Sequence, residues 1–205
     1  MGQQLSARPI RLSRVERHAL TRQRVLDGAK SVFVRLGYGG ASIESIAAEA
    51  GYSRGAVYFS FPNKEALFIE LLRLHTERKT AELEKIASLE PARLIGALTD
   101  WLKTTHADIG FTQLVVELQL LAWRSPEFAV RYNPLREDLD RALGGILETY
   151  FKACGKIRAV EALDMAGCIT ALSLVHGLQH CAGKPDSPDK SGRFIDAMLR
   201  ALIHV

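Results

Sequence analysis

The stretch GYSRGAVYFSFPNKEALF, residues 51–68, decides how the rest of the sequence is read. Ser53 is a residue type that caps helices and Pro62 cannot continue one, so a helix of about two turns is predicted between them. Val57 and Phe61 are four residues apart and predict a single buried side. The other side chains of this short helix, aromatic rings and an arginine among them, are then predicted to lie on the surface.

Two helices are predicted before this stretch. The first ends at Gly37 and begins either at Thr21 or at Ser13, which forms a capping-box pattern with Glu16. The second is short and begins after a Ser42 cap. The apolar spacing of one helix face predicts these buried positions in the first helix: Val25, Ala29, Val32, Phe33 and Leu36.

Two short helices joined by the residues GYS are typical of a helix-turn-helix unit, whose second helix enters the DNA major groove. On that second helix, Arg54 can contact guanine or phosphate, Phe59 can contact a thymine methyl group, and Tyr58 offers a hydroxyl to a phosphate. Gly55 and Ala56 are small enough to let the backbone approach a groove edge. The pattern therefore predicts double-stranded DNA as a partner.

Positive charge is concentrated at the front of the chain. Residues 1–80 hold 13 Lys and Arg against 7 Asp and Glu, whereas the remaining residues hold 14 against 16. Clustered cations suit a polyanion because they displace counterions from phosphates; the alternative is a solvated tail. Residues 1–20 are read as a basic leader, and Arg22 and Lys64 as further candidate phosphate contacts. Lys64 begins a long fourth helix capped by Asn63.

At these residues the sequence resembles the TetR family of bacterial transcription regulators. The resemblance covers residues 21–68 and rests on Gly-Tyr after the first helix, a serine start to the second, I-A-x-x-A-G, S-R-G-x-x-Y-x-x-F and K-E-x-L-F. Ser60 stands where many members have histidine, so that contact is not carried over. The alternative is a helical hairpin with no nucleic-acid role. The resemblance implies DNA contacts by Ser42, Ser53, Arg54, Gly55, Tyr58, Phe59 and Lys64.

The whole chain is read as all-α, with about nine helices. A DNA-binding unit at residues 21–68 is followed by an effector-binding and dimerisation domain at residues 69–205. Helices are predicted to start near Pro91, to carry FTQLVVELQLLAW, and to start after Ser125. Pro134, with Asn133 as a second cap, predicts a break or a kink in the last of these.

The final two helices are strongly apolar and need a covering surface. The resemblance implies that they form a dimer interface with a second copy of the chain; the alternative is a core within one chain. The candidate interface residues are Gly167, Ala171, Leu174, Leu178, Phe194, Met198 and Leu202.

The resemblance also implies a pocket for a small, largely apolar effector between the DNA-binding unit and the dimer interface. For each apolar candidate the alternative is ordinary core packing, and Glu117 faces either water or a cationic effector. The candidate pocket residues are Trp101, Phe111, Leu114, Glu117, Leu118, Trp123, Tyr150 and His176.

Several classes of protein are disfavoured by what the sequence lacks. It has no apolar run of membrane-helix length, no signal-peptide pattern and no cysteine framework, so a cytoplasmic location and no membrane partner are expected. No catalytic motif is found, so no enzyme activity and no cofactor are expected. His176 and His180 share a helix face with no convincing third ligand, so no metal site is expected.

These observations predict a homodimeric repressor that binds a palindromic operator and is released by a small-molecule effector. Two other functions stay open. A helical small-molecule-binding module would not bind DNA, and a DNA-coating protein without effector control would bind with little sequence preference.

Overall fold

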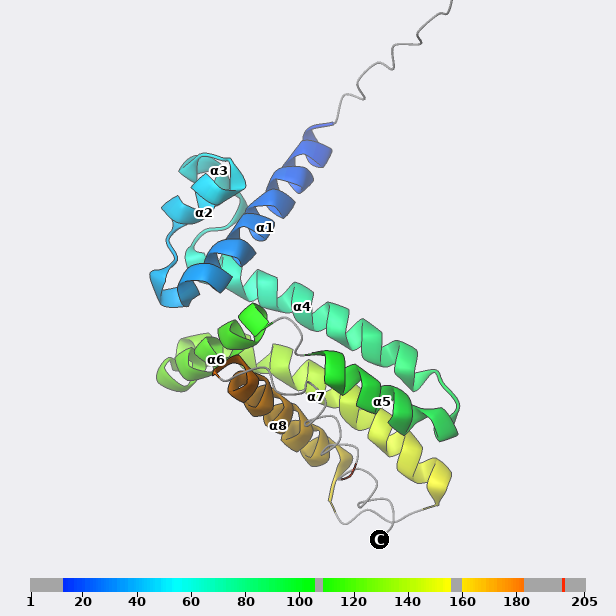
Figure 1. Cartoon of the computed structure of the whole chain (residues 1–205). Helices are drawn as coiled ribbons and strands as arrows, with labels where there is room; N and C mark the ends of the chain where they lie inside the picture. Colours follow the sequence, from blue (N-terminus) through cyan, green and yellow to red (C-terminus); the bar gives the residue numbers. More distant parts are fainter. Residues whose placement is uncertain (1–12, 106–108, 156–159, 183–196, 198–205) are drawn as a thin grey trace, which may run out of the picture.

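The computed structural model describes residues 13–105, 109–155, 160–182 and 197. Within these residues it contains only helices, as predicted (Figure 1). The ninth predicted helix, with Phe194, Met198 and Leu202, lies outside the described residues. The helices are α1 (Arg14–Gly40), α2 (Ile43–Ala50), α3 (Arg54–Ser60), α4 (Lys64–Ala87), α5 (Pro91–Thr105), α6 (Ile109–Arg124), α7 (Pro126–Cys154) and α8 (Ala162–Ala182).

The first three helices start where the capping residues predict. Ser13 and Glu16 form a reciprocal capping box, so α1 begins at Arg14 and residues 14–20 belong to this helix rather than to a separate leader. Ser42 and Ser53 cap α2 and α3 through their side chains. Gly37, at φ 69°, breaks the helical geometry of α1. Leu36, predicted to be buried, is 46% exposed beside this kink.

The core of the helix-turn-helix unit continues into the larger domain. Val25, Phe33 and Phe68 pack in one buried cluster together with residues of α6 and α7, such as Leu118 and Phe128. A second cluster joins the far half of α4 to α5, α7 and α8. Since α4 contributes to both clusters, it runs the length of the molecule and connects the two units (Figure 1).

Of the break or kink predicted at Pro134, the break is absent, because α7 continues through this residue. Proline removes one backbone hydrogen bond from a helix. Buried side chains anchor α7 on both sides of it, with Tyr132 before and Leu143 after. Further along, Gly144 lets α7 approach α8 closely, since a Cβ there would lie 3.3 Å from the Leu163 Cα.

Candidate nucleic-acid interface and internal cavity

The outer side of α3 carries aromatic rings that the core does not use. Val57 and Phe61 are buried as predicted, whereas Tyr58 is 46% and Phe59 76% exposed. Such rings usually stabilise the folded state by being buried in the core. Their exposure on a short helix beside the N-terminus of α2 leaves them free to meet a partner.

The polar residues around α3 are accessible as well. Arg54 is exposed and pairs with Glu44 of α2 at 2.9 Å. A surface ion pair contributes little to stability, so Arg54 can replace Glu44 with another anion at low cost. Gly55 is exposed and Ala56 half-buried. The hydroxyl groups of Ser42 and Ser53 accept hydrogen bonds from backbone N–H groups at the helix starts.

The N-terminal turns of α1 reach α3. His18 lies edge-on to Phe59, with ring centroids 5.2 Å apart. Sequence reasoning missed His18 as a neighbour of the candidate interface. The signal that could have found it is the capping box at Ser13, which extends α1 to include this residue.

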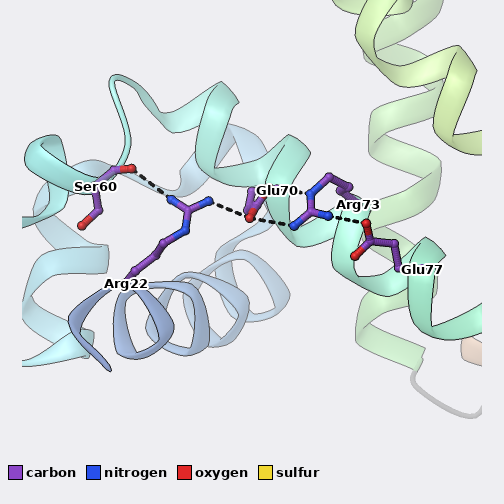
Figure 2. Close-up of polar contacts among 5 residues, drawn as sticks. All are labelled: Arg22, Ser60, Glu70, Arg73 and Glu77. Atoms are coloured by element: carbon purple, nitrogen blue, oxygen red, sulfur yellow. Dashed lines mark hydrogen bonds and ion pairs between the residues drawn. The ribbon is translucent and has the colours of Figure 1, made fainter. Parts of the chain in front are cut away.

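Arg22 links α3 to α4 (Figure 2). Its guanidinium donates to the Ser60 carbonyl oxygen at 3.1 Å and to Glu70 Oε1 at 2.6 Å, and its Cζ lies 4.2 Å from the centre of the Phe61 ring. A phosphate contact by Arg22 stays a prediction. The structure gives it partners inside the protein, at the end of the outward-facing helix.

Glu70 is shared between two arginines. Arg73 donates to both of its carboxylate oxygens, at 2.8 and 3.0 Å, and also contacts Glu77 (Figure 2). Hydrogen bonding to Arg73, and then to Arg22, holds the pKa of Glu70 below its ordinary value despite burial. The network therefore runs from the last residue of α3 along the first turns of α4.

Lys64 also has internal partners. Its ammonium donates to the carbonyl oxygens of Tyr38 and Ala41, at 2.7 and 2.9 Å, and lies 4.4 Å from the centre of the Tyr38 ring. Burial lowers the pKa of Lys64. A phosphate contact by this residue stays a prediction, with one ammonium N–H beyond the two that bind carbonyl oxygens.

Glu117 is exposed, in line with the alternative that it faces water, and it also has a partner within the protein. Its carboxylate accepts a hydrogen bond from the backbone N–H of Tyr38 at 2.7 Å, at the kink of α1. A Cβ on Gly37 would lie 2.8 Å from Glu117 Oε1, so glycine permits this approach. The α6 helix is thereby attached to the helix-turn-helix unit.

A cavity of about 400 Å³ lies among α4, α5, α6, α7 and α8. Trp101 and Phe111, two of the candidate pocket residues, line it. The other apolar candidates lie elsewhere. Leu114 and Leu118 are buried in the cluster shared with α1, Trp123 is 81% exposed, and Tyr150 packs against the second cluster. The His176 side chain lies outside the described residues.

The polar lining of the cavity is a feature that the apolar pattern did not reveal. Lys79 and Asp140 are buried and charged, and Arg136 lies beside Asp140 at 2.9 Å. Thr170 donates to the other Asp140 oxygen at 2.8 Å. Burial raises the pKa of Tyr132, another lining residue, to about 12.

The candidate dimer surface is partly described. On α8, Ala171 is exposed and Gly167, Leu174 and Leu178 are half-buried. Leu172 is 45% exposed on the same helix. Apolar side chains of α8 are thus accessible to a partner surface that is also apolar.

Two findings concern only the described part of the chain. There, no group of three or more His, Cys, Asp or Glu residues is arranged to hold a metal ion. No helix among the described residues is long and apolar enough to cross a membrane.

The fold and the surface define a class of protein, in which an N-terminal helix-turn-helix unit is joined to a helical bundle with an internal cavity. The family described as "Bacterial regulatory proteins, tetR family" matches residues 25–71. Taken with the relatives described below, this match shows that residues 25–71, which span most of the helix-turn-helix unit and the start of α4, are of the TetR-family type.

Among curated relatives, the HTH-type transcriptional repressor Rv1474c of Mycobacterium tuberculosis is 40% identical over 84 residues, which cover 41% of this chain and 42% of the relative. The HTH-type transcriptional repressor AcnR of Corynebacterium efficiens is 31% identical over 123 residues, 60% of this chain and 62% of the relative. The chain therefore spans 42% to 62% of the length of these two proteins. Their names describe regulators, in line with the expectation that the chain is not an enzyme.

Solved structures share the fold over most of the chain. A putative TetR-family transcriptional regulator from Rhodococcus sp. has a TM-score of 0.74 at 17% identity, covering 90% of this chain and 99% of that one. The regulator FadR from Bacillus subtilis, in complex with stearoyl-CoA, has a TM-score of 0.71 at 17% identity, covering 88% and 97%.

Proposed function

We propose that the chain is a transcriptional repressor that binds a DNA operator through α3 and is released by a small molecule bound in the cavity. The observation that carries this proposal is the exposure of Tyr58 and Phe59 next to Arg54 on the second helix of the helix-turn-helix unit. Rv1474c and AcnR are named repressors, which supports the proposal that this chain represses transcription. We assign DNA contact to residues 21–68, and effector binding and dimerisation to residues 69–205.

The proposed operator is palindromic because we propose a homodimer. Leu172 of α8 is an apolar residue that is 45% exposed outside the cavity, and a partner surface that covers it would stabilise the dimer. A two-fold dimer presents two copies of α3, which fit successive major grooves about 34 Å apart.

Two connections couple the cavity to DNA binding. Leu72 and Thr76 of α4 line the cavity, and the same helix holds Arg22 and the end of α3 through Glu70. Val115 of α6 lines the cavity, and two residues further on Glu117 holds the backbone of α1. A ligand that shifts α4 or α6 therefore changes the position of α3 relative to its copy in the dimer. Both half-sites must be engaged together, so a small shift lowers operator affinity.

Selection of bound duplexes from a random pool by the purified chain tests this function. The expected result is an enriched motif with two inverted half-sites. Binding without an enriched motif would favour a DNA-coating protein, and no binding at low salt would favour a small-molecule-binding module.

A further inference from the structure

The cavity has an apolar wall and a polar side. Leu102, Val115 and Leu135, from three different helices, line it together with the rings of Trp101 and Phe111. Such a wall suits the hydrocarbon or aromatic body of a ligand. The volume of about 400 Å³ is at the lower end of the range for small-molecule sites, roughly 300 to 1,000 Å³.

The Asp140 and Gln119 acceptors on the polar side already have partners within the protein. The two oxygens of Asp140 accept from Arg136 and Thr170, at 2.9 and 2.8 Å. The side-chain oxygen of Gln119 accepts from the Tyr132 hydroxyl at 2.9 Å.

Donors, in contrast, are in surplus. Among the described residues, the Lys79 ammonium donates one hydrogen bond, to Glu82, although it has three N–H groups. Arg136 donates to Asp140 and has further guanidinium N–H groups. The amide NH₂ of Gln119 adds two more donors beside its occupied oxygen. Ligand oxygen atoms can accept from these groups.

The lining also carries an excess of positive charge. Lys79, Arg136 and Asp140 line the cavity, whereas Glu82, the partner of Lys79, does not. The Lys79 side chain is 11% exposed and that of Glu82 37% exposed, so the carboxylate lies on the outer side of the pair. The Trp101 indole N–H holds it there at 2.8 Å. Lys79 keeps this ion pair at 3.0 Å, and two of its three N–H groups remain for an acceptor in the cavity.

We propose that the cavity binds an amphipathic organic anion, with a carboxylate at Lys79 and Arg136 and an apolar body against Trp101, Phe111 and the aliphatic wall. This inference rests on the proposed function, because it names the ligand class of the proposed effector site. Lys79 lies on α4, the helix that carries Glu70, so the carboxylate binds the element that positions α3.

Calorimetric titration of the full chain with matched acids and amides tests the ligand class. The probes are decanoate and decanamide, 4-butylbenzoate and its amide, and 2-naphthylacetate and its amide. At least one acid should bind tenfold or more tighter than its amide, because hydrogen bonds from Lys79 and Arg136 are stronger to a charged acceptor than to a neutral one. Equal affinities within every pair, or no binding by any of the acids, would overturn the proposal.

Variants of the two cations separate charge recognition from loss of folding. Lys79→Met and Arg136→Met should each remove most of the preference for the acid, while Lys79→Arg, which keeps the charge, should retain it. Lys85→Met changes an exposed lysine of the same helix and should have no effect. An unchanged preference in both methionine variants would contradict the assignment, and Lys79→Arg guards against misreading an unfolded variant.

The operator assay distinguishes this inference from the proposed function. If an acid binds with the expected preference and operator affinity stays unchanged, the ligand class stands and release by the effector fails. If a neutral probe binds more tightly than every acid and releases the operator, the repressor function stands and the anion class fails.

Discussion

Replacing Arg22 by Met removes the link between the end of α3 and the start of α4. The lost contacts are the hydrogen bond to the Ser60 carbonyl oxygen at 3.1 Å, the ion pair with Glu70 at 2.6 Å and the stacking on Phe61 at 4.2 Å. The Arg22 and Glu70 side chains are 35% and 17% exposed, so the pair is sheltered but not fully buried. Glu70 keeps its bonds to Arg73, so the variant leaves no carboxylate without a partner.

The expected loss of unfolding free energy follows from these contacts. Charge-assisted hydrogen bonds contribute about 1.5 to 3 kcal/mol, and partial exposure of Arg22 reduces this to about 1 to 1.5 kcal/mol. The cation–π contact with Phe61 adds about 0.5 to 1 kcal/mol. A total of about 2 kcal/mol corresponds to a decrease in Tm of about 4 to 8 °C for a chain of this size.

Thermal unfolding and the salt dependence of DNA affinity together test this account of Arg22. Arg22→Met should lower Tm and weaken operator binding, because α3 is less firmly held, while the slope of log affinity against log salt stays the same. Arg14→Met, at an exposed position at the start of α1, is the control and should leave Tm unchanged. If Arg22→Met leaves Tm unchanged and lowers the slope by about one, Arg22 is a phosphate contact and the internal link is refuted.

Other predictions concern stability and assembly. Because the pKa of Glu70 is lowered, its stabilising effect is fully present above pH 4.5 and is lost as pH falls through the lower pKa of the folded state, so Glu70→Gln should be less stable than wild type at pH 7 and converge with it in acid; parallel curves of Tm against pH would contradict this. Gly37→Ala, at φ 69° and facing Glu117, should cost about 1 to 2 kcal/mol on thermal unfolding, whereas Gly39→Ala, with open space around it, should not; equal Tm values would disprove the strain. Leu172→Glu on α8 should shift the sedimenting species from dimer to monomer, and an unaltered dimer would place the interface elsewhere.

The elements that the sequence predicts well depend on short-range contacts. Each of these helix starts is determined by residues close in sequence, because the capping side chain accepts a hydrogen bond from the backbone N–H three residues further along. The capping residues are Ser13, Ser42, Ser53 and Asn63. The burial of Val57 and Phe61, with an exposed ring at Phe59, follows from helix spacing alone.

The features that the sequence does not predict depend on residues far apart in the chain. Arg22 and Glu70 are 48 positions apart, and Tyr38 and Glu117 are 79 apart. Apolar spacing on α6 predicts that Leu114 and Leu118 are buried, but the neighbours of α6 decide whether they meet a cavity or a core. At Pro134, local propensity predicts a break, and packing of α7 against its neighbours prevails.

The most direct test of whether α3 reads base pairs is to measure how tightly Phe59→Ala and Arg54→Ala bind a selected operator. Each variant is also measured on a scrambled duplex of the same length. Both side chains are exposed, so Tm should stay unchanged while operator affinity falls by about 1 to 3 kcal/mol per variant and affinity for the scrambled duplex changes little. Wild-type affinity for the operator in both variants would contradict DNA reading by α3.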